Sequence, residues 1–252
     1  ILLLFSPLNM IISNNEIGVN DKELFDEELL EIKDTAGRTT TIWSGTVSLN
    51  QDYFVGNVDE LVINACTQIF MDSGVRIYVD GRIVIQGTKT CPVIMNNSGS
   101  GDHGGIVFNQ NSTGRGSILN NLTIRNSLWG ITMFGGDAIM HNITIHNADY
   151  VAIDLFNSAS PQIYDLIIQD GGQDLHPGSS TWRYGIGISI GNFSAPIIKN
   201  VVIDNLITRG LNFWTGSGGM YRNLSISNIT GAIQATPAAI WMMDSIALFD
   251  GL

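Results

Sequence analysis

A short block of residues recurs along the second half of the chain, and this repeat limits the fold more than any other feature. Each copy begins and ends with Asn or Asp and carries apolar residues at its second and fourth positions. The copies are Asn121–Asn126, Asn142–Asn147, Asp165–Asp170, Asn200–Asn205 and Asn223–Asn228. Their starts are separated by 21, 23, 35 and 23 residues. Periods of this length are typical of solenoids, in which each repeat is one structural unit.

A second apolar block recurs in step with the first. Its copies are Gly130–Phe134, Ala152–Phe156, Gly187–Gly191, Gly210–Trp214 and Ala232–Thr236. The long interval in both series contains an insertion, Gly171–Arg183. Because both series keep their spacing across the insertion, we predict two sets of short strands. The first set lies near 122–125, 143–146, 165–168, 200–203 and 223–226, and the second near 131–134, 152–156, 187–190, 211–214 and 232–235.

Alternation within the blocks predicts which side chains face the core. In the first copy Leu122 and Ile124 point to one side of a strand and Thr123 to the other. The same rule predicts an inward set: Leu122, Ile124, Ile143, Ile145, Leu166, Ile168, Val201, Ile203, Leu224 and Ile226. One coil of strands cannot bury its own apolar face, but stacked coils form a continuous core. We therefore expect an all-β parallel β-helix with coils of about 21–25 residues.

The polar residue that ends each first block forms a second regular series. Its members are Asn126, Asn147, Asp170, Asn205 and Asn228. Asn tolerates left-handed backbone angles at turns, and stacked amides can hydrogen-bond to one another. We interpret the series as a structural ladder and not as a metal site.

The repeated motif Asn-apolar-Thr-Ile-x-Asn resembles the right-handed parallel β-helix proteins of the pectin-lyase-like fold. The segment Leu61–Ile94 adds to the resemblance through Ile77–Ile83 (IYVDGRI) and Gly87–Ile94 (GTKTCPVI). These look like the entry coils of secreted or surface β-helix proteins of bacteria and archaea. The resemblance covers about residues 40–252. It implies a single-stranded right-handed β-helix but no particular activity, since many functions share this scaffold.

The remaining chain is expected to fall into two short segments. Residues 1–12 (ILLLFSPLNMII) read as a signal-peptide remnant or an N-terminal cap. Residues 13–38 hold an acidic run and read as a linker or short helix. The β-helix is expected to occupy residues 39–252. Its pattern reaches Leu252 without a polar capping repeat, so we expect further domains of a longer chain.

Charge narrows the class of partner. The chain has 12 Lys+Arg and 23 Asp+Glu, a net charge of −11. Nucleic acid is therefore excluded as a partner, because its binders neutralise phosphates with Lys and Arg. No segment is long and apolar enough to suggest a transmembrane span. The signal-like start favours a secreted or cell-surface location.

The two cysteines, Cys66 and Cys91, lie 25 residues apart, close to one coil of the repeat. A disulfide between neighbouring coils is one interpretation, favoured by an extracellular location. Two small, partly buried thiols are the other.

Catalytic motifs known from β-helix enzymes are absent. The four motifs of polygalacturonase-like hydrolases, Asn-Thr-Asp, Asp-Asp, Gly-His-Gly and Arg-Ile-Lys, do not occur. Lyases of this fold use Ca²⁺ and a basic residue, and hydrolases use paired carboxylates. The sequence predicts no metal or cofactor, apart from Ca²⁺ if the protein were a lyase.

Candidate ligand-binding residues come from two places. The second block has an outward column formed by Thr132, Asp154, Ser189, Asn212 and Gln234, which we expect to be exposed. The insertion adds Asp174, His176, Trp182, Arg183 and Tyr184, and we expect it to form one wall of a groove beside Asp154 and Ser189. Aromatic rings there would suit sugar rings. Alternatively, polar residues on the column are simply exposed, and Trp182 only pins the loop.

The expected function is therefore a secreted or cell-surface β-helix module with a structural, adhesive or glycan-binding role, whose partner would be a polysaccharide or surface glycan. The alternative is a polysaccharide lyase or glycoside hydrolase acting beside residues 171–184.

Overall fold

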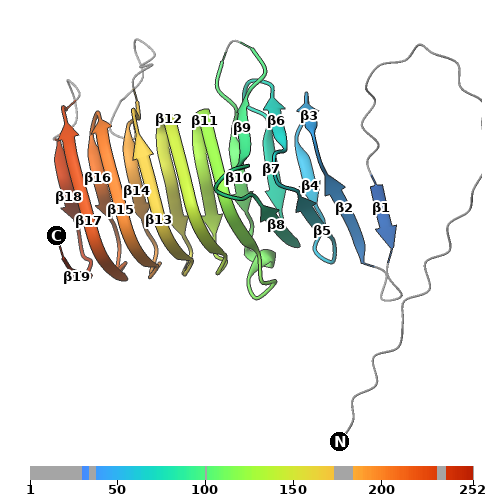
Figure 1. The fold of residues 1–252 in the computed structure, drawn as a ribbon. Coiled ribbons are helices and arrows are strands. Elements are labelled where there is room, and N and C mark those ends of the chain that lie inside the picture. Colours follow the sequence, from blue (N-terminus) through green and yellow to red (C-terminus); the bar gives the residue numbers. More distant parts are fainter. Residues whose placement is uncertain (1–29, 34–37, 100, 173–183, 232–236, 252) are drawn as a thin grey trace, which may run out of the picture.

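The computed structural model describes residues 30–33, 38–99, 101–172, 184–231 and 237–251, and shows an all-β protein. Its strands lie side by side in one long array (Figure 1). They are β1 (Leu30–Lys33), β2 (Thr39–Trp43), β3 (Thr46–Leu49), β4 (Tyr53–Val55), β5 (Glu60–Ile63), β6 (Gln68–Met71), β7 (Arg76–Val79), β8 (Arg82–Gln86), β9 (Val93–Asn97), β10 (Gly105–Phe108), β11 (Ile118–Phe134), β12 (Ile139–Phe156), β13 (Gln162–Gln169), β14 (Ile186–Ile190), β15 (Ile197–Leu206), β16 (Arg209–Phe213), β17 (Met220–Ile229), β18 (Ala238–Met242) and β19 (Leu248–Asp250).

Helical structure among these residues is limited to one 3-10 turn, η1 (Gln110–Ser112). Within the described ranges, no helix has the length and apolar character needed to cross a membrane.

The strands pair in three parallel stacks. Stack one contains β2, β5 and β8, the first parts of β11, β12, β13, β15 and β17, and then β19. Stack two contains β3, β6, β9 and the later parts of the same long strands. Stack three contains β4, β7, β10, the ends of β11 and β12, and then β14, β16 and β18. This long parallel sheet is compatible with the expected β-helix.

The two predicted sets of blocks fall into two of these stacks. The first blocks pair in stack two, where Leu122, Ile143 and Leu166 occupy equivalent positions in successive coils. The second blocks pair in stack three, where Ile131, Ile153 and Ile188 do the same. Every pairing within either set is parallel, as predicted.

Asn and Asp residues form the bends between the stacks. The predicted ladder residues, Asn126, Asn147, Asp170, Asn205 and Asn228, all have φ between 52 and 59° and lie between stacks two and three. An equivalent series, Asn121, Asn142, Asp165, Asn200 and Asn223, has φ between 50 and 60° and lies between stacks one and two. Asn and Asp adopt this left-handed conformation more readily than other non-glycine residues. The first residue of each block thus has the same backbone role as the last.

Side chains of each bend also bind those of neighbouring coils. Asn205 donates to the Asp170 carboxylate at 2.7 Å, and Asn223 donates to the Asn200 oxygen at 2.9 Å. The C-terminal member of the ladder departs from this pattern, because Asn228 donates to Asp204 and not to Asn205.

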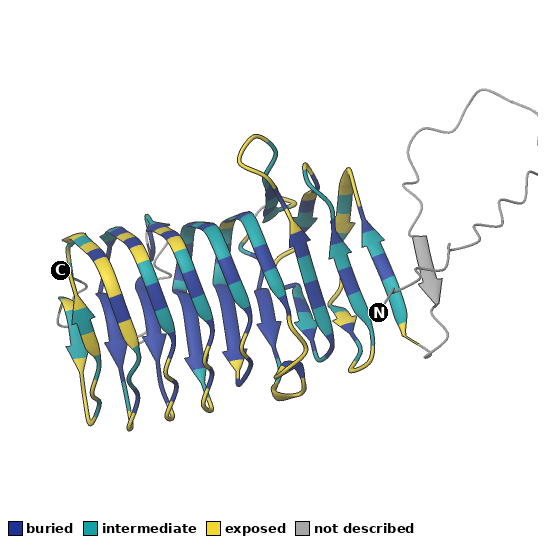
Figure 2. Ribbon diagram, turned by 60° about the horizontal axis from the view of Figure 1, so that its bottom comes forward, coloured by how far each residue is buried: buried dark blue, intermediate teal, exposed yellow. Residues whose placement is uncertain are grey.

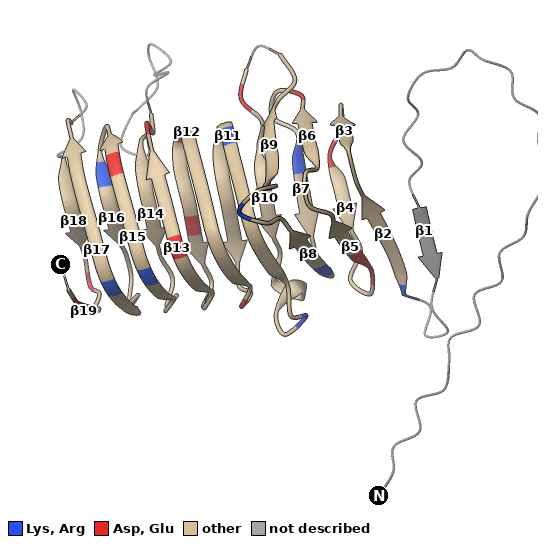
Figure 3. Ribbon diagram, in the orientation of Figure 1, with Lys and Arg blue, Asp and Glu red and all other residues tan. Residues whose placement is uncertain are grey.

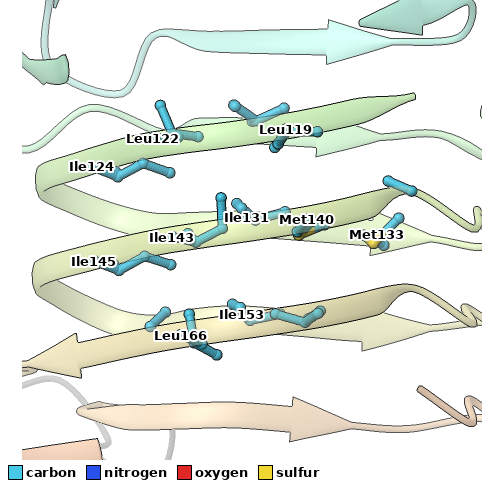
Figure 4. Packing of buried hydrophobic residues seen from close by; sticks show 14 of the residues in the cluster. Leu119, Leu122, Ile124, Ile131, Met133, Met140, Ile143, Ile145, Ile153 and Leu166 are labelled. Atoms are coloured by element: carbon cyan, nitrogen blue, oxygen red, sulfur yellow. The ribbon is translucent and has the colours of Figure 1, made fainter. Parts of the chain in front are cut away.

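The core runs through the middle of the stacked coils (Figure 2). Leu122, Ile124, Ile143 and Ile145 have no exposed surface, and their side chains point into the space between the stacks (Figure 4). The other predicted core residues are also buried, except Ile226, which packs against the core but stays partly exposed.

One predicted strand is wrong. The last copy of the second block predicts a strand near 232–235 that pairs with β16. In the structure β16 pairs with β18 instead, so that Leu211 lies opposite Ile240. The connection from β17 to β18 is longer than the connection from β15 to β16 in the preceding coil, and stack three therefore resumes at Ala238. The expected block itself, residues 232–236 with Gln234, lies outside the described residues.

The N-terminal end of the array differs from the rest. Within the segment 13–38, expected as a linker or short helix, β1 pairs antiparallel with β2. Residues 1–12, expected as a signal remnant or cap, lie outside the described residues.

Candidate functional site

The outer face of stack three carries one column of polar residues. Thr132, Asp154, Ser189 and Asn212 occupy equivalent positions on β11, β12, β14 and β16. They alternate with core residues such as Ile153 and therefore point away from the core. We call these four residues the polar floor.

The polar floor is buried, although the sequence predicted an exposed column. Its side chains are 7, 5, 4 and 0% exposed, in chain order. Alternation predicts the direction of a side chain but not what lies above it, so this expectation was wrong. Side chains that point outward and are nevertheless buried indicate a recessed surface, and Thr132, Asp154 and Ser189 line hollows there.

Aromatic side chains stand along one side of the polar floor. Phe134, Phe156 and Trp214 each follow directly after a core residue of stack three, at Met133, Leu155 and Phe213. The rings of Phe134 and Phe156 stack with centroids 5.9 Å apart. The ring of Trp214 meets that of Trp241 edge to face at 5.2 Å. We call Phe134, Phe156 and Trp214 the aromatic wall.

A second aromatic column borders the polar floor on β11, β12 and the segment before β14. Trp129 stacks on Tyr150 at 4.6 Å, and Tyr150 stacks on Tyr184 at 4.4 Å. The guanidinium of Arg76 lies 5.0 Å from the Trp129 ring centre, a cation–π distance.

Two phenol groups at the end of this column are hydrogen-bonded to each other. The Tyr150 and Tyr184 hydroxyls lie 3.0 Å apart. This hydrogen bond, together with burial and nearby charge, raises the pKa of Tyr150 to about 12.

Two hollows lie over the polar floor. The first, of about 250 Å³, is lined by Val151, Asp154, Phe156, Ile186, Ser189, Gly191, Asn192, Trp214 and Thr215. The second, of about 360 Å³, is lined by Arg76, Val107, Trp129, Thr132, Phe134, Asp154, Phe156, Asn157 and Asn192. Because Asp154, Phe156 and Asn192 line both, the hollows are neighbours in one groove.

Charge in the groove is sparse. Among the described residues that line the two hollows, Asp154 is the only acid and Arg76 the only base. Charged residues are also widely spaced over the rest of the strand array that the structure describes (Figure 3). The groove surface is therefore mostly aromatic and neutral polar, which suits a ligand with hydroxyl groups and flat apolar faces.

Arg209 lies at the C-terminal end of the polar floor. It donates from Nη1 to the Asn212 side-chain oxygen at 2.6 Å, and its guanidinium lies 4.2 Å from the Trp241 ring centre. Burial lowers the pKa of Arg209. This contact fixes the Asn212 amide against the end of the groove.

The structure therefore brings together part of the predicted site. Asp154, Ser189 and Asn212 share the polar floor, and Asp154 and Ser189 line a hollow. Tyr184 is buried and belongs to the second aromatic column. Asp174, His176, Trp182 and Arg183 lie outside the described residues, so the wall predicted from the insertion stays a prediction.

Sequence analysis missed the aromatic wall. Its signal was present, because Phe134, Phe156 and Trp214 each end a copy of the second block. Their shared position was visible, but nothing in the alternation showed that these terminal residues line a groove together with the polar floor.

The other predicted features lie elsewhere. Cys66 and Cys91 form a disulfide with Cα atoms 4.8 Å apart. A separate series of polar residues in register, formed by Arg125, His146, Gln169 and Asp204, lies on stack two. In the part of the chain that the structure describes, no group of three or more His, Cys, Asp or Glu side chains could hold a metal ion.

Comparison of the chain with known proteins identified no similar protein. No protein-family model matches the chain, and no curated protein and no solved structure matches it either.

Proposed function

We propose that this chain is a right-handed β-helix module, secreted or displayed at a cell surface, which binds a glycan in the groove over stack three. The observation that carries the proposal is the pairing of the polar floor with the aromatic wall. A sugar ring has hydroxyl groups at its edge and C–H groups on its faces. Such a ligand can hydrogen-bond to Asp154 and Ser189 while it packs on Phe156 or Trp214.

The scaffold supports recognition of an extended ligand. Residues of the polar floor and the aromatic wall recur on successive strands, whose spacing is about 4.8 Å. A site built on strands is held in place by the hydrogen bonds of the stacks, so little order has to be gained on binding.

The disulfide supports the proposed location. Disulfides form and persist in oxidising compartments, which include the cell exterior. Cys66 and Cys91 join neighbouring coils of stack two, away from the groove.

The alternative proposal, a glycoside hydrolase or polysaccharide lyase, rests on Asp154. This carboxylate is 5% exposed and lines both hollows. Hydrolysis by the usual mechanism needs a second carboxylate about 5–10 Å away. Binding needs no such partner, which is why we favour it.

One experiment separates the two proposals. Laminarin, galactomannan, polygalacturonate and alginate would be tested for binding by affinity electrophoresis, with release of reducing ends and of unsaturated products measured in parallel. Glycan binding predicts retardation by at least one polysaccharide without product release. Trp214→Ala should weaken the retardation, whereas Tyr164→Ala, at a half-buried ring on stack one, should not. Product release that Asp154→Asn abolishes would support the enzyme instead, and absence of any binding would contradict both.

A further inference from the structure

The aromatic wall has a gap at Gly191. Met133, Leu155, Ile190 and Phe213 pair in register through stack three. The residues that follow them are Phe134, Phe156, Gly191 and Trp214. Three of these four positions therefore carry an aromatic ring, and the one between Phe156 and Trp214 carries no side chain.

Backbone geometry does not explain this glycine. Gly191 is not among the residues with positive φ, so a residue with a side chain could adopt its conformation. Backbone atoms do not exclude a side chain either. A Cβ at Gly191 would lie 3.7 Å from the ring of Trp214 and would meet ring carbons of Phe156 at 3.2 and 3.3 Å, which is closer than ordinary contact, so the Phe156 ring would have to shift by a few tenths of an ångström. By contrast, a Cβ at Gly187 on the same strand would lie 2.6 Å from the carbonyl oxygen of Gly210.

The space around Gly191 is the first hollow. Phe156, Gly191 and Trp214 line it on one side, while Asp154 and Ser189 line its floor. Its volume, about 250 Å³, is just below the range of roughly 300–1,000 Å³ for drug-sized ligands. An aromatic residue at position 191 would continue the wall and fill this space.

We propose that Gly191 sets the specificity of the groove, because its missing side chain leaves a subsite for one pyranose ring between Phe156 and Trp214. The ring would pack on these two aromatic side chains and direct its hydroxyl groups toward Asp154, Ser189 and Asn192. This inference rests on the proposed glycan-binding function and adds to it a position, a ligand size and a determining residue.

The test compares Gly191→Phe and Gly191→Ala with the wild-type chain, using the polysaccharide that the wild type binds among laminarin, galactomannan, polygalacturonate and alginate. Binding would be measured by calorimetry and folding by thermal unfolding. Gly99→Phe is the matched control, because Gly99 is exposed, lacks a positive φ, and has no atom within 4 Å of an added Cβ.

We expect Gly191→Phe to weaken binding roughly tenfold or more, which corresponds to the loss of about one aromatic–sugar contact. Gly191→Ala should weaken it less, and Gly99→Phe should leave it unchanged. If Gly191→Phe does not fold, Gly191→Ala decides the matter: unchanged affinity in this variant contradicts the inference.

The two proposals fail in different ways. If a folded Gly191→Phe variant binds the polysaccharide with the affinity of the wild type, the proposed role of Gly191 is wrong, but the glycan-binding groove is not contradicted. Absence of binding by the wild type to all four polysaccharides would overturn the proposed function itself, and the subsite with it.

Discussion

The side-chain amide of Asn147 donates a hydrogen bond to the side-chain oxygen of Asn126, 3.1 Å away on the preceding coil. Both residues have φ of 54°. Each ladder residue therefore does two things at once: it bends the backbone between two stacks and it ties one coil to the next.

Substitution at Asn126 should separate these two contributions. Asn126→Ala loses the hydrogen bonds, which costs about 1 kcal/mol, and it keeps a Cβ in the left-handed region without the local hydrogen bonding by which Asn tolerates that conformation. Relative to Gly at the same position, this backbone strain costs roughly 1–2 kcal/mol. Asn126→Gly loses the hydrogen bonds without the backbone strain, so it should be the milder change. The denaturation midpoints of the two variants, compared with that of the wild type, measure these losses. Equal losses would show that backbone strain contributes nothing.

A core substitution should confirm which faces of the strands point inward. Ile145 has no exposed surface, whereas Ile167, on the next coil, is 39% exposed. Ile145→Ala should lower the free energy of unfolding by roughly 2–5 kcal/mol. Ile167→Ala should change it by only about 0.5 kcal/mol. Urea unfolding measures both, and a loss below about 1 kcal/mol at Ile145 would contradict the assignment of faces.

His103 should make the protein sensitive to acid. The ring is buried, with Nε2 3.0 Å from the Arg125 carbonyl oxygen, and Nδ1 accepts from the Gly105 amide. Burial lowers the pKa of His103 from 6.5 to about 4. The unfolded chain therefore takes up a proton first, so the stability tied to this histidine is complete above pH 6.5 and is lost as the pH falls toward 4.

The loss at His103 is on the order of 3 kcal/mol. Unfolding measured between these pH values in wild type and His103→Gln provides the test, because the substitution should flatten the dependence. His141→Gln, at a half-buried ring on stack one, is the control. A wild-type slope that survives in His103→Gln would assign the effect to other groups.

Ionisation of Tyr150 should reveal its contact with Tyr184. The hydrogen bond between the Tyr150 and Tyr184 phenols is the largest cause that raises the pKa of Tyr150 from 10.0 to about 12. The unfolded chain loses this proton first, so the stability involved is present below pH 10 and is lost as the pH rises toward 12. In Tyr184→Phe, absorbance titration should no longer show a tyrosine ionising near pH 12. An unchanged titration would contradict the hydrogen bond.

Replacing the disulfide should destabilise the N-terminal half of the array. Cys66 and Cys91 close a loop with a sequence separation of 25 residues. Cys66→Ser with Cys91→Ser should lower the free energy of unfolding by about 3 kcal/mol, because the open loop gains entropy in the unfolded chain. Thermal unfolding with and without reductant checks this. Reductant should affect the wild type but not the double variant.

Much of the fold could be predicted from sequence because the same residue types recur at equivalent positions of successive coils. From β11 to β17, Asn or Asp recurs at the bends between stacks, and an apolar residue recurs where the chain faces the core, as at Ile124 and Ile145. The misplaced strand shows the limit of this reasoning. The block Ala232–Thr236 fits the pattern, but pairing depends on the length of the connection after β17, which brings Ile240 opposite Leu211.

The site could be predicted only in part. Asp154, Ser189 and Asn212 were identified because alternation places them on one face. Alternation also places Phe156 and Trp214 on this face, two residues after Asp154 and Asn212, but the burial of the column depends on the side chains that flank it in neighbouring coils. The gap at Gly191 is visible only once its neighbours in the stack are known.

The parallel pairing of successive coils has a mechanical consequence. Force applied to one end of the chain would peel the outermost coil from all three stacks while the coils beneath it keep their hydrogen bonds. Extension should therefore rise in steps. The coil from Leu122 to Ile143 spans 21 residues and would release on the order of 70 Å. The coil from Leu166 to Val201 spans 35 residues and would release about 120 Å, so the insertion would mark one longer step in a force–extension trace.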